Sequence, residues 1–283
     1  MKNTYIKSPL NYIGGKHKLL PQIIPIFPSN INTFVDLFGG GFNVGINIKA
    51  NKIIYNDTIE EVVDLLKDLY NTETQECLNK IDKIIEEYNL SKTNKEGYLK
   101  LRQDYNNGNK NYYMFYSLIC YAFNNQIRFN NKREYNMPFG KDRSSFNPTL
   151  RDRFIIFVNQ LHNKNIEFMN VDFKEFDISL LSKNDFVYCD PPYLISCATY
   201  NENNGWNKTK EKDLLDFLDN LNLNNIKFAL SNVITDKNKT NELLKEWSKK
   251  YNIHYLNNTY GNCNYHKLNK NNSITQEVLI TNY

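Results

Sequence analysis

The tetrapeptide Asp190-Pro191-Pro192-Tyr193 stands directly after an apolar run that predicts a buried strand. Ligands of open α/β sheets bind at the carboxyl ends of strands, and two consecutive prolines stiffen such a loop. The Asp190 carboxylate and the Pro191 carbonyl can accept both N–H groups of an exocyclic base amine such as that of adenine, which directs the nitrogen lone pair towards a methyl donor. Tyr193 can stack on a base that has left its duplex, a contact worth about 1–3 kcal/mol. The alternative interpretation is a strand-ending turn with a surface acid and a surface tyrosine.

A glycine-rich turn, Phe38–Phe42, follows a second short apolar strand that is predicted at Thr33–Leu37. Glycines let a backbone approach a ligand closely. The spacing is not G-x-G-x-x-G, and no Gly-Lys-Ser/Thr follows, which disfavours a dinucleotide site or a P-loop. Asp57 ends the next predicted strand, 21 residues after Asp36, where an acid suits the two hydroxyls of a ribose. A tight βα turn beside an isolated acid is the alternative.

A third motif, Asn11–Lys16, places two glycines and a lysine at the start of a predicted helix, Lys16–Ile26. A helix N-terminus of this kind can bind an anion, for example the carboxylate of a methionine.

Positive charge is concentrated in one internal segment. Residues 95–153 hold 11 Lys and Arg against 5 Asp and Glu, although the whole chain carries a net charge of only +4. The same segment is rich in tyrosine and phenylalanine, so a polyanion partner is indicated, with nucleic acid the first candidate. The alternative is a solvated helical face on which charges cluster by chance.

Composition excludes other classes. No apolar run approaches the roughly 20 residues needed to span a bilayer, and the N-terminus lacks the apolar core of a secretory signal. We therefore expect no membrane partner and an intracellular protein. The five cysteines are odd in number and form no C-x-x-C pair, which argues against a disulfide framework and a zinc site.

Hydrophobic periodicity predicts an α/β sheet interrupted by a helical insert. The first part reads as strand, glycine turn, helix from about Asn43 and strand, and the part from about residue 60 to 160 is mostly helical, with a hairpin at Gln126–Phe139. The last part alternates again. Its strands are expected at Ile166–Met169, Phe186–Asp190, Lys227–Ser231, His254–Tyr260 and Glu277–Asn282, and its helices at Lys210–Leu221 and Asp236–Lys250.

Taken in order, these motifs resemble the Dam-like DNA adenine-N6 methyltransferases, the α-group, D12 class of amino-methyltransferases with helical target-recognition domains. The matching segments are Asn11–Lys16 (aromatic-x-Gly-Gly-Lys), Asp36–Gly41 (D-x-F-x-G-x-G), Asn56-Asp57, Asn170–Phe173 (G-D-F), Asp190–Tyr193 (D-P-P-Y) and the final Glu277–Tyr283. The chain departs from the family pattern at two positions. Tyr12 stands where Trp is common, and Asn170 stands where Gly is common.

The resemblance implies a Rossmann-like methyltransferase sheet of seven strands, with the last hairpin antiparallel. It implies a discontinuous catalytic domain, residues 1–60 and 165–283, and a target-recognition subdomain, residues 61–164. The expected reaction moves a methyl group from S-adenosylmethionine to N6 of a flipped-out adenine in double-stranded DNA and leaves S-adenosylhomocysteine, with no metal. A prokaryotic or phage protein of the cytoplasm is implied, and a role in restriction–modification beside a nuclease that forms no stable complex with it.

The resemblance also implies roles for individual residues. The catalytic set is Asp190, Pro191, Pro192 and Tyr193. The cofactor set is Tyr12, Gly14, Gly15, Lys16, Asp36, Phe38, Gly39, Gly41, Asp57, Asp172, Phe173 and Asp190. The DNA-binding set, within the hairpin segment Phe123–Lys141 and just after it, is Asn124, Arg128, Lys132, Arg133, Tyr135, Lys141 and Arg143. Arg128 can read a guanine edge bidentately, and Lys132, Arg133, Lys141 and Arg143 can hold phosphates.

Two other functions remain open at this stage. One is methylation of cytosine N4, RNA or a glutamine amide, although the aspartate at position 190 and the basic insert weigh against a protein substrate. The other is a DNA-binding relative that has lost catalysis. The hairpin resembles that of enzymes reading GATC, but the sequence does not determine the recognition site, and it leaves the oligomeric state open.

Overall fold

The computed structural model describes residues 5–12, 14–108, 110–195, 205–257 and 275–283. The chain forms two compact units, the first made of residues 1–17, 39–47 and 57–170 and the second of residues 18–38, 48–56 and 171–283. Several positions named above lie outside the described residues: 258–260 of one predicted strand, Cys197, Cys263 and position 13 of the Asn11–Lys16 motif.

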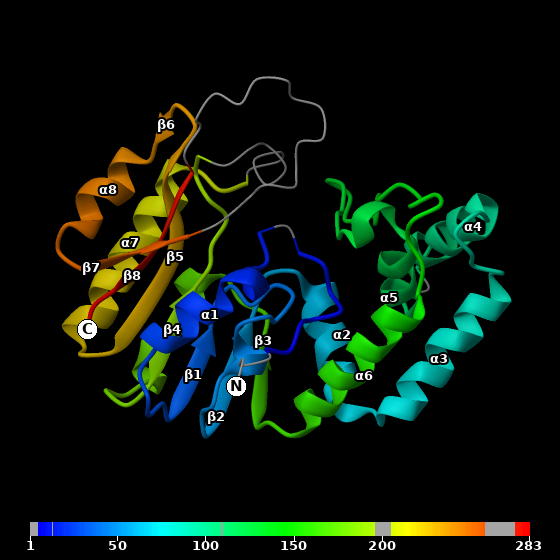
Figure 1. The fold of residues 1–283 in the computed structure, drawn as a ribbon, viewed down its shortest axis with the longest axis horizontal. Helices are drawn as coiled ribbons and strands as arrows, with labels where there is room; N and C mark the ends of the chain where they lie inside the picture. The colour runs from blue at the N-terminus through cyan, green and yellow to red at the C-terminus, as the bar shows by residue number, and fades with distance from the viewer. Residues whose placement is uncertain (1–4, 13, 109, 196–204, 258–274) are drawn as a thin grey trace. The chain divides into compact units, whose positions relative to one another are not determined.

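The second unit is built on a mostly parallel sheet (Figure 1). Its strands are β1 (Thr33–Asp36), β2 (Lys52–Asn56), β4 (Phe186–Cys189), β5 (Lys227–Asp236), β6 (Lys239–Thr240), β7 (Asn252–Leu256) and β8 (Gln276–Thr281). They follow the order β2-β1-β4-β5-β8-β7, and β6 pairs with β5. The first four in this order are parallel, whereas β8 is antiparallel to both of its neighbours. The expected α/β sheet with an antiparallel last hairpin is confirmed.

Burial explains why these segments form central strands. All four residues of β4 are buried, as are the last five of β8. Near-continuous apolar runs of this kind are typical of strands covered on both faces. Asp36 pairs with Tyr188 in the register of β1 and β4, so the carboxyl ends of these two neighbouring strands lie at the same edge of the sheet.

Helices α7 (Lys208–Leu223) and α8 (Glu242–Ser248) both pack against β5. Each begins after an asparagine whose side chain accepts a backbone N–H of the first turn, Asn207 for α7 and Asn241 for α8. Such caps satisfy donors that a helix N-terminus leaves unpaired.

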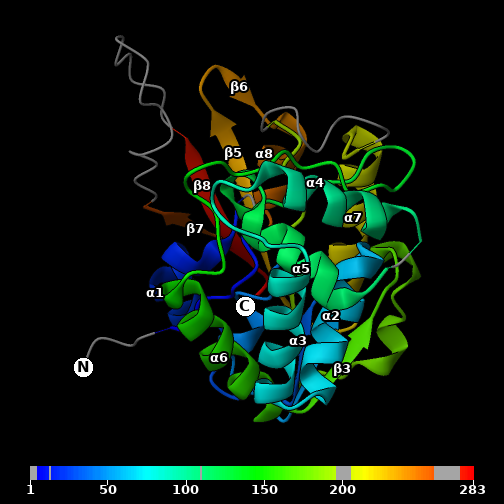
Figure 2. The same ribbon diagram turned by 90° about the vertical axis from the view of Figure 1, so that its right-hand side faces the viewer.

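The first unit is mainly helical. It contains η3 (Gly45–Asn47), α2 (Glu60–Asn71), α3 (Thr74–Glu87), α4 (Lys95–Asn106), α5 (Tyr112–Tyr121), η4 (Phe123–Asn125), α6 (Pro148–His162) and the strand β3 (Ile166–Met169). Helix α5 packs against α2, α3 and α4 (Figure 2). Its sequence is apolar on nearly every side, which suits a helix that neighbours surround.

Some predicted boundaries were wrong. The helix expected at Lys16–Ile26 is divided into η1 (Lys16–Leu19), α1 (Leu20–Ile23) and η2 (Ile24–Ile26), because Pro21 and Pro25 cannot continue a regular helix. The helix expected from Asn43 is only the short η3. Strand β5 runs five residues beyond Ser231 and turns through Lys237, at φ +56°, into β6, so the helix expected from Asp236 begins at Glu242.

Eight strands are present in the described residues, one more than expected, and the additional strand is the two-residue β6. None of the helices in this part of the chain has the length and hydrophobicity needed to cross a bilayer. The predicted division into a catalytic domain and a target-recognition subdomain stays a prediction.

Candidate active site and nucleic-acid interface

In the first unit, the ring of Tyr12 lies against the glycine loop. A Cβ added to Gly40 would stand 3.3 Å from Tyr12 Cδ1, and one added to Gly41 would stand 2.9 Å from the Leu10 carbonyl oxygen. Gly40 also has φ +47°, a conformation that side-chain-bearing residues rarely adopt. Gly40 is therefore required by its backbone conformation and by the packing of Tyr12, and Gly41 by the close approach of the Leu10 backbone.

Asp57 is bonded to the same loop. Its Oδ2 accepts the Gly40 N–H at 2.8 Å, and its Oδ1 accepts the Ile59 N–H at 2.9 Å. Burial raises the pKa of the Asp57 carboxyl, and these backbone hydrogen bonds oppose that rise. Each carboxylate oxygen can accept a second hydrogen bond, so the group retains acceptor capacity for a pair of hydroxyls.

Asn170 lies in the loop that follows β3 and is hydrogen-bonded to the backbone of Asp57. Its Nδ2 donates to the Asp57 carbonyl oxygen at 2.7 Å. The asparagine that departs from the family's usual glycine therefore has a bonding partner in the backbone of the predicted ribose-binding residue.

Lys16 is buried at the end of the Asn11–Lys16 motif, and its Nζ donates to the Gly14 carbonyl at 2.8 Å. Gly15 N–H closes the turn on the Tyr12 carbonyl at 3.2 Å. The helix that Lys16 begins has only four residues, which weakens the case for anion binding by a helix dipole and leaves the Lys16 ammonium as the candidate group.

In the second unit, Asn56 fixes the two loops that carry predicted cofactor residues. Its buried side chain donates to the Leu37 carbonyl at 2.9 Å and to the Val171 carbonyl at 3.1 Å, and it accepts the Val171 N–H at 3.0 Å. Leu37 precedes Phe38, and Val171 precedes Asp172, which caps the short helix η5 (Phe173–Glu175) through its side chain. Asn56 thus sets the positions of both loops.

Three rings of the second unit form an aromatic cluster, here called the aromatic wall: Phe38, Phe173 and Trp206. Phe38 lies 5.7 Å from Phe173 and 5.8 Å from Trp206 between ring centroids, and Phe173 lies 5.9 Å from Trp206. Phe173 and Trp206 are buried, whereas Phe38 is half-buried. The wall can therefore offer one aromatic face to a planar ligand such as a purine. Trp206 was missed in the sequence analysis.

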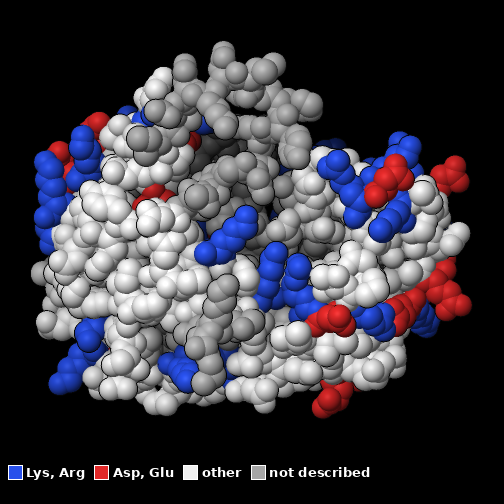
Figure 3. Space-filling view, viewed as in Figure 1, with Lys and Arg blue, Asp and Glu red and all other residues white. Residues whose placement is uncertain are grey.

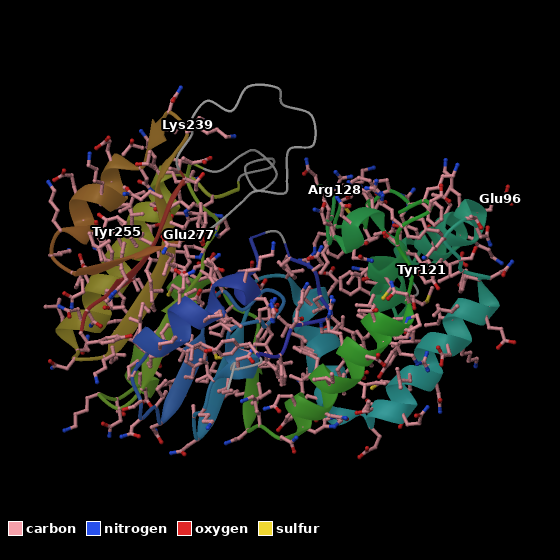
Figure 4. All side chains as sticks on the ribbon, viewed as in Figure 1. Glu96, Tyr121, Arg128, Lys239, Tyr255 and Glu277 are labelled. Atoms are coloured by element: carbon pink, nitrogen blue, oxygen red, sulfur yellow. The ribbon has the colours of Figure 1, made fainter. Side chains whose placement is uncertain are left out.

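The Asp-Pro-Pro-Tyr corner follows β4, and its acid and its tyrosine are bonded to each other. Tyr193 Oη donates towards Asp190 Oδ1 at 3.1 Å and lies 3.4 Å from Glu277 Oε1. Asp190 and Tyr193 are both partly exposed, so the corner is not sealed inside the hydrophobic core. Glu277, on β8, is fully buried (Figure 4). It was not predicted as a site residue, although a glutamate beginning a buried Val-Leu-Ile run is an unusual pattern.

Negative charge gathers at this end of the strands. Burial raises the pKa of the Tyr188 hydroxyl well above its usual value, and the neighbouring charges of Asp190, Asp36 and Glu277 raise it further. Tyr188 therefore stays neutral, and its hydroxyl is paired with Ser231 Oγ at 2.8 Å. Asp36, the last residue of β1, is buried.

The predicted hairpin of the first unit closes through isolated bridges rather than a continuous ladder. Ala122 pairs with Phe139, and Phe129 pairs with Tyr135. Asn106 of α4 anchors one arm by exchanging two hydrogen bonds with the backbone of Tyr135, at 2.9 and 3.0 Å. The segment is thus held against the helices of its own unit.

The structure separates the predicted DNA-binding residues into three groups. Five are exposed and have no acidic partner within the part of the chain that the structure describes: Asn124, Arg128, Lys132, Lys141 and Arg143. Arg133 is exposed but pairs with Glu61 of α2 at 2.9 Å. Tyr135 is buried, with 1 % of its surface exposed, and its Oη donates to the Gln126 carbonyl. The Tyr135 side chain therefore supports the hairpin and is unavailable for the DNA contact that we predicted.

Arg128 (labelled in Figure 4) is hydrogen-bonded to Asn136 across the hairpin. Its Nε donates to Asn136 Oδ1 at 2.8 Å, and one terminal nitrogen donates to the Asn136 carbonyl at 3.1 Å. Arg143 lies over the exposed Phe123 ring, with 5.6 Å from Cζ to the centroid. On the face drawn in Figure 3, Lys and Arg side chains lie beside Asp and Glu side chains in several places rather than forming one unbroken basic surface.

Comparison with known proteins decides the family. The model of the D12 class N6 adenine-specific DNA methyltransferases matches residues 12–262. The chain belongs to this family. The chain is also similar to the type II methyltransferase M.FokI of Planomicrobium okeanokoites, 53 % identical over 285 residues, and to the modification methylase StsI of Streptococcus sanguinis, 47 % identical over 285 residues. The DNA adenine methylase of Salmonella typhi is 26 % identical over 255 residues, 87 % of this chain and 86 % of that protein.

The resemblance drawn from the motifs is confirmed by these matches. The alignments to M.FokI and StsI cover 99 % of this chain but 43 % of each relative. The chain therefore spans less than half the length of these two relatives.

Proposed function

We propose that this chain transfers the methyl group of S-adenosylmethionine to N6 of an adenine that has been flipped out of duplex DNA. The observation that supports this most directly is the partly exposed Asp190–Tyr193 corner at the carboxyl end of β4, in a chain of the D12 family. An aspartate at this position, followed by two prolines and a stacking ring, suits a planar nitrogen whose lone pair must be localised.

The residues present fit S-adenosylmethionine chemically. The first unit holds a buried ammonium, Lys16, suited to a carboxylate, and the Asp57 carboxylate, suited to ribose hydroxyls. The second unit holds the aromatic wall, suited to a purine. When bound, the cofactor supplies an electrophilic methyl group on its sulfonium.

In the proposed reaction, Asp190 and the Pro191 carbonyl accept the two N–H groups of adenine N6, and Tyr193 stacks on the base. N6 would form a bond to the methyl carbon as the bond between that carbon and sulfur breaks. N6 would then lose one of its two protons, and the Asp190 carboxylate, which accepts that N–H, would take it up. Extrusion of the base is required because stacked neighbours block access to N6. Burial of Pro191 keeps its carbonyl fixed.

The test is methylation by the purified chain with methyl-labelled S-adenosylmethionine, offered duplex DNA, RNA and protein separately, followed by nucleoside analysis. We expect label in N6-methyladenine of duplex DNA. Label in N4-methylcytosine, or only in RNA or protein, would overturn the proposal. Absence of label together with intact DNA binding would instead support a relative that has lost catalysis.

Similarity to M.FokI, a type II methyltransferase, and to StsI, a modification methylase, also supports a modification role in a restriction–modification system, which would place the protein in the cytoplasm of a prokaryote or of a phage-infected cell. We expect DNA methylated by this chain to resist a nuclease encoded beside its gene. A digest that cuts methylated and unmethylated DNA equally would contradict this role.

Arg128 and Lys141 are expected to affect DNA binding in different ways. Arg128→Ala should weaken binding to the methylated site about 10–100-fold more than binding to unrelated DNA, because a bidentate base contact is worth about 1–3 kcal/mol. Lys141→Ala should weaken binding to the methylated site and to unrelated DNA equally. It should also reduce the slope of the logarithm of the binding constant against the logarithm of the salt concentration by about 0.9, the value for one phosphate contact. Fluorescence anisotropy over a range of salt concentrations measures both effects.

The DNA sequence that the protein methylates is first identified by sequencing DNA that it has methylated. Lys245→Ala, an exposed lysine on α8 of the second unit, is the matched control for loss of one positive charge. If Arg128→Ala weakened binding to the methylated site and to unrelated DNA by the same factor, Arg128 would be assigned to a phosphate contact instead of a base contact.

A further inference from the structure

Glu211 is a buried charge that the proposed reaction does not use. It lies in the first turn of α7 with 0 % of its surface exposed. Its Oε2 accepts the indole N–H of Trp206, and its Oε1 accepts the side-chain amides of Asn241 at 2.7 Å and Asn232 at 3.3 Å. Burial raises the pKa of the Glu211 carboxyl, and these three hydrogen bonds oppose the rise. A buried carboxylate is costly unless it is fully bonded, so this arrangement requires an explanation.

The donors around Glu211 are themselves fixed. The Asn232 oxygen accepts the Val233 N–H at 2.7 Å, and the Asn241 oxygen accepts the Leu244 N–H at 3.1 Å as the cap of α8. Because their oxygens are engaged, both amides must turn their NH₂ groups towards Glu211. The carboxylate is therefore a rigid acceptor, held by β5 and by the start of α8.

This rigid acceptor determines the orientation of Trp206. An indole N–H that is buried needs a hydrogen-bond partner, and Glu211 supplies it. The indole then meets Phe38 at 80° between ring planes and Phe173 at 47°. Trp206 supports both rings from the buried side, while Phe38 keeps a partly exposed face.

We propose that Glu211 is a positioning residue for cofactor binding: it orients Trp206, which packs with the buried Phe173 and holds the partly exposed Phe38 as the platform for the adenine ring of S-adenosylmethionine. This inference rests on the proposed function, because it assigns the aromatic wall to the cofactor. A purely structural role for Glu211, joining α7 to β5, predicts lower stability without a specific change in cofactor affinity.

The chain offers a spectroscopic test because it contains two tryptophans. Trp247 packs on Phe228 and Tyr251, so Trp247→Phe replaces one ring by another and leaves Trp206 as the single indole reporter. We expect its emission to change saturably on titration with S-adenosylhomocysteine and with adenosine, but not with methionine. The complementary variant Trp206→Phe, which keeps Trp247, should show no change.

Glu211→Gln gives the second measurement. Glutamine retains the shape but has one acceptor oxygen and one NH₂ group facing three donors. At least one donor therefore loses its partner, and the rigid acceptor that fixes the indole is disrupted. We expect binding of S-adenosylhomocysteine, measured by calorimetry, to weaken about 10-fold or more, with DNA affinity unchanged.

The matched control is Asp219→Asn. Asp219 also lies on α7 and also accepts a tryptophan N–H, that of Trp247, at 2.9 Å, but Trp247 is not part of the aromatic wall. This variant should lose stability while keeping the affinity of the original chain for S-adenosylhomocysteine.

The outcomes separate this inference from the function on which it rests. If the unaltered chain does not bind S-adenosylhomocysteine, both fail. If it binds but Trp206 emission is unresponsive, the inference fails and the function stands. Equal affinity losses in Glu211→Gln and Asp219→Asn would likewise overturn the inference. The fluorescence measurement decides the matter even if Glu211→Gln does not fold, because it needs no change at Glu211.

Discussion

Asp190→Ala is expected to reduce single-turnover methyl transfer to duplex DNA by at least about 10³-fold, the upper part of the range seen when one preorganised polar group is removed from an active site. The variant removes the acceptor that localises the N6 lone pair and takes up the leaving proton. The fold should be retained, because Asp190 is partly exposed and follows β4 rather than lying within it. Rapid-quench kinetics with labelled cofactor measures the rate, and circular dichroism checks the fold.

Asp190→Asn separates the two duties of the acid. The amide oxygen can still accept one N–H, but the side chain no longer takes a proton. We expect a rate between those of the unaltered chain and the alanine variant, with a smaller loss if lone-pair localisation dominates. Asp216→Ala, an exposed acid on α7, is the control for removing a carboxylate from the second unit. Asp190→Ala with an unchanged rate would defeat the assignment of the corner as the catalytic site.

Local chemistry explains which parts of this site could be predicted. The Asp190–Tyr193 corner and the glycine loop are contiguous, and the residue types that define them restrict the backbone directly. The strands that precede them are short apolar runs, and they were placed within one or two residues of the observed β1 and β4. Prediction was harder at β5, because the reversal through Lys237 at φ +56° has no glycine to indicate it.

Contacts distant along the chain could not be predicted from local pattern. The ion pair of Arg133 with Glu61 joins residues 72 positions apart, and the hydrogen bond of Asn241 to Glu211 joins residues 30 apart. Both change the interpretation of a charge: Arg133 is already paired, and Glu211 is a buried acceptor rather than a solvated residue of a helix. Tyr135 differs, because its alternation with Met137, which is also buried, was a local signal for an inward-facing arm that the prediction of a DNA contact overlooked.

Asp57→Asn is expected to weaken the binding of S-adenosylhomocysteine about 10–150-fold at pH 8, since a hydrogen bond to a charged group contributes about 1.5–3 kcal/mol. The asparagine can keep one acceptor oxygen for the Gly40 N–H, which bonds to Oδ2 in the original chain, so the bond to the glycine loop is retained. The bond from the Ile59 N–H to Oδ1 is lost, because the NH₂ group of the asparagine then faces it. What is also lost is the ionised acceptor for the ribose hydroxyls. Isothermal titration calorimetry measures the difference. Asp152→Asn, an exposed acid on α6, is the matched control in the first unit.

The pH dependence of the same binding provides a sharper result. Because burial raises the pKa of Asp57, its carboxyl takes up a proton at a higher pH than an ordinary aspartate does. A protonated carboxyl accepts hydroxyl hydrogen bonds less well, so cofactor affinity should be full above the raised pKa and decline as the pH falls through it. In Asp57→Asn the part of this decline that comes from Asp57 should be absent, so the affinities of the two chains should converge as the pH falls. If both chains lose affinity in parallel as the pH falls, the ionised Asp57 is not the group that binds the ribose.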